Sequence, residues 1–118
     1  MSKLQILFLS LALLTVSLAA QAQNTAAQKG LQEVQIKTSA QCDMCKMRIE
    51  EALAFTPGVK KAELNVETKV ATIAYNPKKT DVQKLREAIA KVGYDADEVS
   101  SDPKAYEALP ACCKKGGH

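Results

Sequence analysis

Apolar and polar residues alternate along several short stretches of the chain. This period of two predicts β-strands, because successive side chains of a strand point to opposite faces. The clearest case is the first stretch, where Val34, Ile36 and Thr38 alternate with polar residues. The second and third stretches are separated by Glu67-Thr68, which predicts a tight turn between two paired strands. The predicted strands cover residues 34–39, 61–66, 69–75 and, with the weakest pattern, 94–99.

Two further stretches repeat their apolar residues at the spacing of a helix. The first runs from Cys45 to Leu53 on its buried face, and the Thr-Pro-Gly sequence that follows Phe55 predicts its end. The second carries apolar residues from position 82 to position 92. We expect Thr80 to cap this second helix and the glycine after it to end it in a left-handed conformation.

The predicted elements follow one another in the order β-α-β-β-α-β. Two right-handed β-α-β crossovers of this kind interleave their strands into one four-stranded antiparallel sheet with both helices on the same face. The sequence therefore predicts an α+β, ferredoxin-like sandwich over residues 33–99. Its open sheet face carries Lys37, Lys61 and Glu63, which suit contact with water. Beyond this domain, a short helix is predicted at 103–109.

The amino-terminal segment has the pattern of a signal peptide. Lys3 precedes an uncharged apolar run, and Ala-Gln-Ala at 20–22 provides the small residues that a signal peptidase recognises. We predict that segment 1–22 is cleaved off after Ala22, that the protein is exported to a bacterial periplasm, and that it has no membrane association afterwards. Residues 23–32 are predicted to form a flexible leader.

Charge and aromatic content exclude some classes of function. The chain of 118 residues has 16 Lys and Arg and 13 Asp and Glu, which are interspersed, so it lacks the basic surface of a nucleic-acid-binding protein. It has three Tyr, two Phe and no Trp, too few to stack bases or sugars. A chain of this length can build one small domain.

Cys42 and Cys45 lie where the first strand gives way to the first helix. The positive end of a helix dipole favours thiolates there. Two thiolates about one turn apart suit a soft ion of low coordination number, copper(I) first and then mercury(II) or silver(I). Zinc can also bind thiolates but usually takes four protein ligands. Met44 and Met47 lie nearby, and we expect them to be exposed or to fill gaps rather than to bind metal.

Two other uses of a CxxC pair remain open. A redox pair at a helix start is the arrangement of thioredoxins, which have a longer, parallel α/β order and residues other than Asp43 and Met44 between the cysteines. A structural disulfide is the third use, since exported proteins often contain disulfides. The four cysteines form two close pairs rather than a spread framework, which favours metal binding.

The span 33–99 resembles the heavy-metal-associated domains of copper chaperones, of copper-exporting P-type ATPases and of the periplasmic mercury-binding protein. The shared features are the CxxC motif and the segments ATIAYNP and DVQKLREAIAKVGYDA. The resemblance implies a carrier, not an enzyme, in which Cys42 and Cys45 hold the metal and Tyr94 lies beside the metal loop. It also implies a donor or acceptor such as a P-type ATPase, and a monomer that can pair through a shared metal ion.

One feature departs from the family pattern. Ser39 and Ala40 stand where the family usually has Gly-Met, so we expect the metal loop to be less well supported. On the helix surfaces, Lys46, Arg48 and Lys91 are candidates for a face that docks a partner.

The tail, residues 100–118, adds Cys112, Cys113 and His118 to the candidate ligands. Three roles remain open for them: further metal ligands, disulfide partners of the CxxC motif, or an untethered thiol tail that hands metal to a partner. A disordered tail without such a role is the simpler alternative. An antiparallel fourth strand would end opposite the metal loop. To reach that loop, the tail would therefore run back about 20 Å, which is the length of a six-residue strand.

Overall fold

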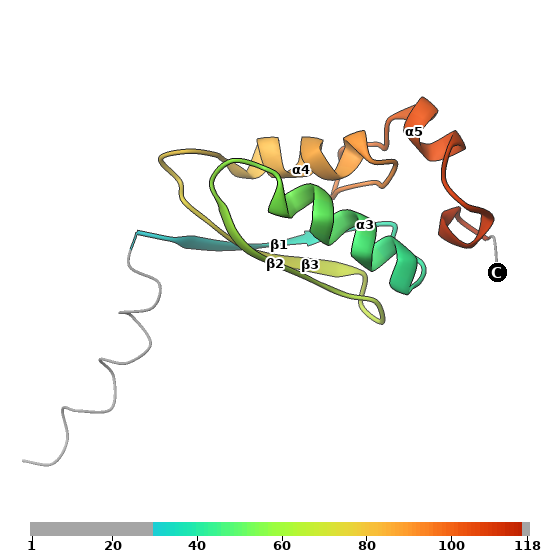
Figure 1. The fold of residues 1–118 in the computed structure, drawn as a ribbon, viewed down its shortest axis with the longest axis horizontal. Helices are drawn as coiled ribbons and strands as arrows, with labels where there is room; N and C mark the ends of the chain where they lie inside the picture. The colour runs from blue at the N-terminus through green and yellow to red at the C-terminus, as the bar shows by residue number, and fades with distance from the viewer. Residues whose placement is uncertain (1–29, 117–118) are drawn as a thin grey trace, which may run out of the picture.

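The computed structural model describes residues 30–116 of the chain. The elements are β1 (Gln32–Lys37), α3 (Asp43–Ala54), β2 (Val59–Asn65), β3 (Val70–Tyr75), α4 (Val82–Lys91), α5 (Pro103–Glu107) and the 3-10 helix η1 (Ala111–Cys113). Helices α3 and α4 cover one face of an antiparallel sheet, and α5 and η1 form a helical tail at one end (Figure 1). None of the helices in this range is long and apolar enough to cross a membrane. The predicted signal peptide, residues 1–22, and His118 lie outside the described residues.

The sheet has three strands in the order β1-β3-β2, each antiparallel to its neighbour. Ile36 of β1 and Leu64 of β2 both oppose Ala71 of the central strand, so their apolar side chains share the covered face. The predicted hairpin between β2 and β3 is confirmed, although its turn is longer than the two residues expected. Lys69 takes a positive φ of 66° there, and its N–H donates to the Asn65 carbonyl at 2.7 Å.

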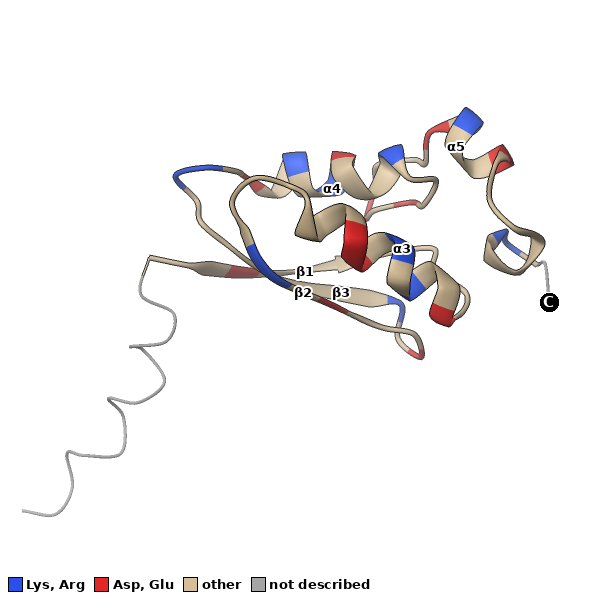
Figure 2. Cartoon of the chain, in the orientation of Figure 1, with Lys and Arg blue, Asp and Glu red and all other residues tan. Residues whose placement is uncertain are grey.

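The core lies between the sheet and the helices. Helix α3 contributes Cys45, Ile49 and Leu53, which are three of the four residues that the sequence pattern predicted on its buried face; the fourth, Ala52, is half-buried. Charged residues lie along the outer side of α4 (Figure 2). On the open sheet face Lys37, Lys61 and Glu63 are exposed, as predicted. The largest fully buried side chains are Tyr94, Ile36, Ile49, Leu53, Leu64, Ile73, Leu85, Ile89, Cys45 and Cys113.

Helix α4 is capped by Asp81 and not by Thr80, the residue predicted. The Asp81 carboxylate accepts a hydrogen bond from the Lys84 N–H at 2.9 Å. Thr80 is buried instead and packs against Gly58, where an added Cβ would lie 3.0 Å from Thr80 Cγ2. Packing therefore occupies the threonine side chain and moves the helix start along the chain by one residue.

The predicted fourth strand at 94–99 does not form within the described residues. Ala96 makes only isolated bridges to Thr38 and to Val99. Asp97 adopts a positive φ of 52° and reverses the chain, so that Val99 returns to Ala96 instead of continuing along β1. The prediction was wrong because alternating polarity does not reveal a left-handed residue in the middle of a segment.

This reversal keeps the tail at the end of the molecule where α3 begins. The Asp102 N–H donates to the Ala90 carbonyl near the end of α4 at 2.9 Å, and α5 starts at the next residue. The Asp102 carboxylate caps α5 by accepting the Ala105 N–H at 2.9 Å. Figure 1 shows α5 and η1 beyond the amino-terminal end of α3. The expectation that the tail starts opposite the CxxC loop is therefore wrong.

Gly93 ends α4 and lets the tail pack closely against it. Its φ is +104°, the left-handed conformation predicted for this position. A Cβ at Gly93 would lie 3.0 Å from the carbonyl carbon and oxygen of Ala105 and 3.1 Å from Leu109 Cδ1. The close approach of α5 therefore requires a residue without a side chain.

Candidate metal-binding site

The site is built at the start of α3. Cys42 is the residue that precedes the helix, in an extended conformation with φ −155°, and Cys45 lies in the first turn. Their sulfurs are 3.4 Å apart. Cys45 is completely buried and Cys42 is partly exposed, so solvent reaches the pair from the side of Cys42.

The start of the helix makes Cys42 acidic. Partial burial by itself would raise the pKa of the Cys42 thiol, but hydrogen bonds from the N–H and thiol of Cys45, and then from the N–H of Met44, lower it to about 7. Such N–H groups have no partner within the first turn of an α-helix. A large fraction of Cys42 is therefore thiolate at neutral pH, which is the form that binds metals.

The tail brings two more thiols to Cys42. The Cys113 sulfur lies 3.9 Å from the Cys42 sulfur and 3.9 Å from the Cys112 sulfur, and these three sulfurs all lie within 4.8 Å of one another. Cys113 is 1% exposed, whereas Cys112 is partly exposed. All four cysteines are free thiols. His118, the last predicted tail ligand, lies outside the described residues.

Tyr94 lies beside this group of thiols. Its side chain is completely buried, and its hydroxyl has no hydrogen-bond partner among the described residues. Burial, and then the neighbouring thiols of Cys45 and Cys113, raise the pKa of Tyr94 well above its usual range. Burial also raises the pKa of the Cys113 thiol to about 12, against the opposing effect of the Tyr94 hydroxyl. Cys42 is thus the acidic member of the group and Cys113 is a protonated one.

Side-chain hydrogen bonds support the loop between β1 and α3. The Ser39 hydroxyl accepts the Asp95 N–H at 2.9 Å. Thr38 Oγ1 accepts the Ala40 N–H at 3.2 Å and donates to the Lys69 carbonyl at 2.8 Å. Ala40 is completely buried. Ser-Ala in place of Gly-Met therefore removes a large apolar side chain and adds a hydroxyl anchor, so the loop is better supported than expected.

Several contacts hold the tail against the domain. Leu109 is 6% exposed and belongs to the core. The Lys115 N–H donates to the Tyr106 hydroxyl at 3.1 Å, and the Lys115 ammonium pairs with the Asp95 carboxylate. This pairing is the main reason that the pKa of Asp95 lies below its usual value. The described part of the tail is therefore docked.

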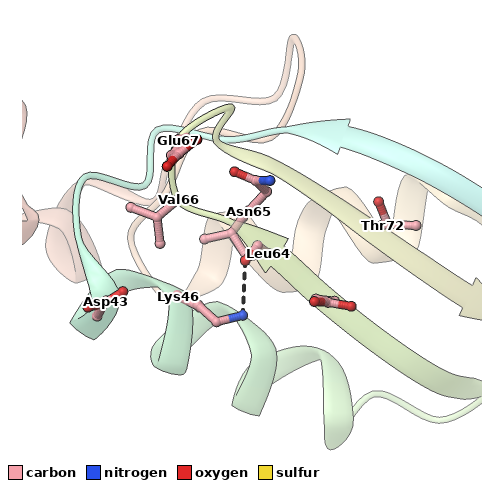
Figure 3. Close-up of a pocket in the computed structure, with 8 residues that line it drawn as sticks. Asp43, Lys46, Leu64, Asn65, Val66, Glu67 and Thr72 are labelled. Atoms are coloured by element: carbon pink, nitrogen blue, oxygen red, sulfur yellow. Dashed lines mark hydrogen bonds between the residues drawn. The ribbon is translucent and has the colours of Figure 1, made fainter.

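A shallow hollow lies between α3 and the β2–β3 hairpin (Figure 3). It is lined by Asp43, Lys46, Glu63, Leu64, Asn65, Val66, Glu67 and Thr72 and contains none of the four thiols. Lys46 Nζ donates to the Leu64 carbonyl at 3.0 Å and pairs with Glu50. Lys46 is thus engaged within the domain, which argues against its predicted part in a docking face. Arg48 and Lys91 are exposed.

Sequence reasoning named the four cysteines and Tyr94 but missed the residues that hold them together. Ser39 was interpreted only as a departure from the family pattern, although a hydroxyl beside a loop is a common hydrogen-bond anchor. Asp95 and Lys115 have opposite charges, but no spacing rule connects residues 20 positions apart outside regular structure. Met44 and Met47 are 46% and 68% exposed, as expected.

The fold and the thiol pair define a class of small α+β metal-binding domains with a CxxC motif at the junction of the first strand and the first helix. The heavy-metal-associated domain family matches residues 36–95, which is half of the chain. The chain belongs to this family. Cys112 and Cys113 lie outside the matched residues, so family membership alone does not explain them.

Individual proteins of this kind are also similar to the chain. The copper-exporting P-type ATPase of Staphylococcus saprophyticus is 49% identical over 55 residues, which are 47% of this chain and only 7% of the ATPase. The CopZ metallochaperone aligns with a TM-score of 0.54 at 29% identity, over 55% of this chain and 98% of that one. Oxidized MerP from Ralstonia metallidurans CH34 aligns with a TM-score of 0.55 at 31% identity, over 57% and 94% of the two chains.

Proposed function

We propose that the protein is an exported carrier that binds copper(I) through Cys42 and Cys45 and passes it to a partner by exchange of thiolate ligands. The observation that carries this proposal is the pair of sulfurs 3.4 Å apart at the start of α3, one with a pKa of about 7, inside a heavy-metal-associated domain. Thiolates select soft ions over hard ones. Copper is favoured because the similar ATPase is copper-exporting and CopZ is a metallochaperone.

The partial exposure of Cys42 suits transfer. A partner's cysteine approaches from the side of Cys42, binds the ion as a third thiolate, and then replaces one of the original two. The copper stays in the +1 state throughout. The incoming thiol loses its proton and the departing thiolate gains one, so the exchange needs neither an oxidant nor a reductant. A three-coordinate intermediate also avoids release of a free ion.

We infer that the partner presents thiolates of its own, as a P-type copper ATPase would. Both proposed ligands come from one chain, so a monomer can do this work without catalysing a reaction. Met44, Met47 and Arg48 are exposed on α3 close to the CxxC motif in sequence. These side chains offer soft, apolar and positive contacts to such a partner.

Export to the periplasm is part of the proposal and rests on the pattern of residues 1–22. Expression of the full-length sequence in a bacterium and mass spectrometry of the purified protein test it. We expect a protein that begins at Gln23 and is released with the periplasmic fraction. A cytoplasmic protein that retains Met1 would contradict export.

Copper binding is tested by anaerobic titration of the reduced protein with copper(I) in the presence of a strong chromogenic chelator. The wild type is expected to withdraw copper from the chelator, and Cys42→Ser to lose this ability. Met44→Ala is the matched control, because it removes a soft sulfur from the same turn without touching the thiols. Equal competition by the wild type and Cys42→Ser would reject the thiolate carrier.

Mercury(II) is the second candidate cargo, since it is a soft ion that two thiolates can bind and the span 33–99 resembles the periplasmic mercury-binding protein. The same thiolates would bind it, so the residues do not separate the two metals. Titration with mercury(II) beside copper(I) does so. Retention of mercury(II) by a protein that yields copper(I) to the chelator would favour a mercury scavenger.

A further inference from the structure

We propose that Cys42, Cys112 and Cys113 form a second metal site, a three-thiolate site that overlaps the CxxC pair at Cys42. The inference rests on the proposed function for its cargo, copper(I). It adds a role for the tail, which retains the ion after the CxxC pair has received it.

The distances between the sulfurs suit three-coordination. An ion bound in the plane of three thiolates at about 2.3 Å separates the sulfurs by about 4.0 Å. The Cys113 sulfur lies 3.9 Å from the Cys42 sulfur and 3.9 Å from the Cys112 sulfur. The sulfurs of Cys42 and Cys112 lie within 4.8 Å of each other. Two thiolates on opposite sides of an ion would instead be about 4.6 Å apart. The CxxC pair, at 3.4 Å, would have to open to reach that separation.

The triangle formed by the sulfurs of Cys42, Cys112 and Cys113 is part of the docked structure. Cys113 and Leu109 are both buried, and Lys115 fixes the end of the tail to Asp95. The position of the tail also depends on the chain reversal at Asp97, without which a fourth strand would carry the tail away from α3. These contacts hold two thiols beside Cys42 before any metal is bound.

Tyr94 gives an independent indication that something binds here. Its hydroxyl is buried, lacks a hydrogen-bond partner among the described residues, and has the thiols of Cys45 and Cys113 as neighbours. A buried hydroxyl without a partner is unfavourable. When a metal ion converts these thiols to thiolates, they become good acceptors for the Tyr94 O–H. Occupation of the site therefore completes the hydrogen bonding of this residue.

Because Cys42 belongs to both sites, the ion can change site without leaving the protein. Cys112 and Cys113 join the ion as Cys45 departs, and Cys42 stays bound throughout. The two tail thiols give up two protons, of which one goes to Cys45 and the other to water. Copper remains in the +1 state. An ion held by three thiolates is harder for a two-thiol competitor to remove, so the tail has to be displaced before handover.

The test compares variants of the full-length chain, expressed and purified in the same way. Copper(I) is titrated anaerobically against the chelator, and X-ray absorption at the copper edge gives the number of sulfur ligands. We expect about three sulfurs in the wild type and in Cys45→Ser, because the triangle does not include Cys45. We expect two in Cys112→Ser/Cys113→Ser, with copper lost to the chelator at least about tenfold more readily.

A matched pair of lysine variants tests the tail without removing a thiol. Lys115→Ala deletes the ammonium that pairs with Asp95, whereas Lys114→Ala deletes its neighbour, which lies 3.6 Å from Glu107 on the surface. We expect only Lys115→Ala to weaken retention. If Cys45→Ser fails to fold, as circular dichroism would show, the tail variants still decide the question.

Two sulfur ligands in the wild type, with no effect of Cys112→Ser/Cys113→Ser, would overturn the three-thiolate site and leave the CxxC carrier standing. Loss of copper binding in Cys45→Ser as complete as in Cys42→Ser would also overturn it. Failure of the wild type to compete for copper at all would reject the carrier and the second site together.

Discussion

The Asp95 N–H donates to the Ser39 hydroxyl at 2.9 Å, which ties the CxxC loop to the residue that anchors the tail. The Asp95 carboxylate pairs with Lys115 and also accepts the Ser101 N–H at 2.9 Å. One residue therefore positions the loop through its backbone and the tail through its side chain. A change at Asp95 or at its partners alters how the two pairs of cysteines meet.

The first prediction concerns the tail anchor. In Lys115→Ala we expect the buried Cys113 thiol to react with a maleimide at least about tenfold faster than in the wild type, because a docked residue reacts only after local opening. Mass spectrometry of peptides from the metal-free protein measures the rate. Lys114→Ala serves as the control. Equal rates in all three proteins would mean that the Asp95–Lys115 pair does not hold the tail.

The same ion pair predicts sensitivity to acid. The pKa of Asp95 is lowered in the folded protein, so the pair stabilises docking fully above the ordinary pKa of an aspartate, about 3.9. That stabilisation is lost as the pH falls through the lowered value. We expect hydrogen exchange at the amide of Lys115 to lose protection as the pH is lowered below about 4, after correction for the intrinsic rate. Asp95→Asn should abolish this dependence, and its persistence there would assign it to another group.

The helix start predicts an acidic thiol at Cys42. We expect the alkylation rate of Cys42 in the reduced, metal-free protein to rise with pH to a midpoint of about 7, because the free N–H groups of the first turn stabilise its thiolate. Cys113, with a pKa raised to about 12, should remain slow throughout the same range. Iodoacetamide labelling read by mass spectrometry separates the two sites. A Cys42 midpoint near the ordinary 8.5 of a free cysteine would contradict the prediction.

Gly93→Ala tests the packing of the tail on α4. The substitution places a side chain at a φ of +104° and 3.0 Å from the Ala105 backbone, so we expect the free energy of unfolding to fall by about 2–4 kcal/mol. Gly30→Ala is the control, since it has a φ of +80° but nothing within 4 Å of the added Cβ. Denaturant unfolding measures both. Equal losses of unfolding free energy in the two variants would show that α5 moves away from the added side chain without destabilising the protein.

Tyr94→Phe is expected to have different effects on the metal-free and the copper-loaded protein. The hydroxyl lacks a partner in the described structure, so its removal should leave the stability of the metal-free protein unchanged or raise it by about 1 kcal/mol. In the copper-loaded protein the same variant should lose copper to the chelator several-fold more readily. A destabilised metal-free protein with unchanged copper retention would show that the hydroxyl serves folding alone.

Periodicity in the sequence was enough to predict three strands, both main helices and most of their buried residues. Ile36 lies on the apolar face of β1, Ile49 on that of α3 and Leu85 on that of α4, and the apolar residues of each face follow the spacing of their own element. Hydrophobic burial leaves few alternatives for such residues. The CxxC motif was equally visible because its two cysteines are local. These features depend on residues that are close together in the sequence, so they can be recognised without knowledge of the fold.

The remainder depends on single backbone angles and distant contacts. The positive φ of Asp97 removes the fourth strand, yet an aspartate inside an alternating segment gives no clear sign of it. The choice of Asp81 over Thr80 as a helix cap depends on how Thr80 packs against Gly58. The docking of the tail combines several such contacts, so the role of its cysteines could only be left open.

The two thiol sets also differ in when they can form. Cys42 and Cys45 are three residues apart and come together as soon as the first turn of α3 forms, whereas Cys42 and Cys113 are 71 residues apart. Closing the longer loop has the larger entropic cost and requires the domain and the tail to have packed already. A newly folding chain therefore has an open CxxC pair, which can meet an ion, an oxidant or another thiol. Docking of the tail then places Cys112 and Cys113 beside Cys42 and ends that interval.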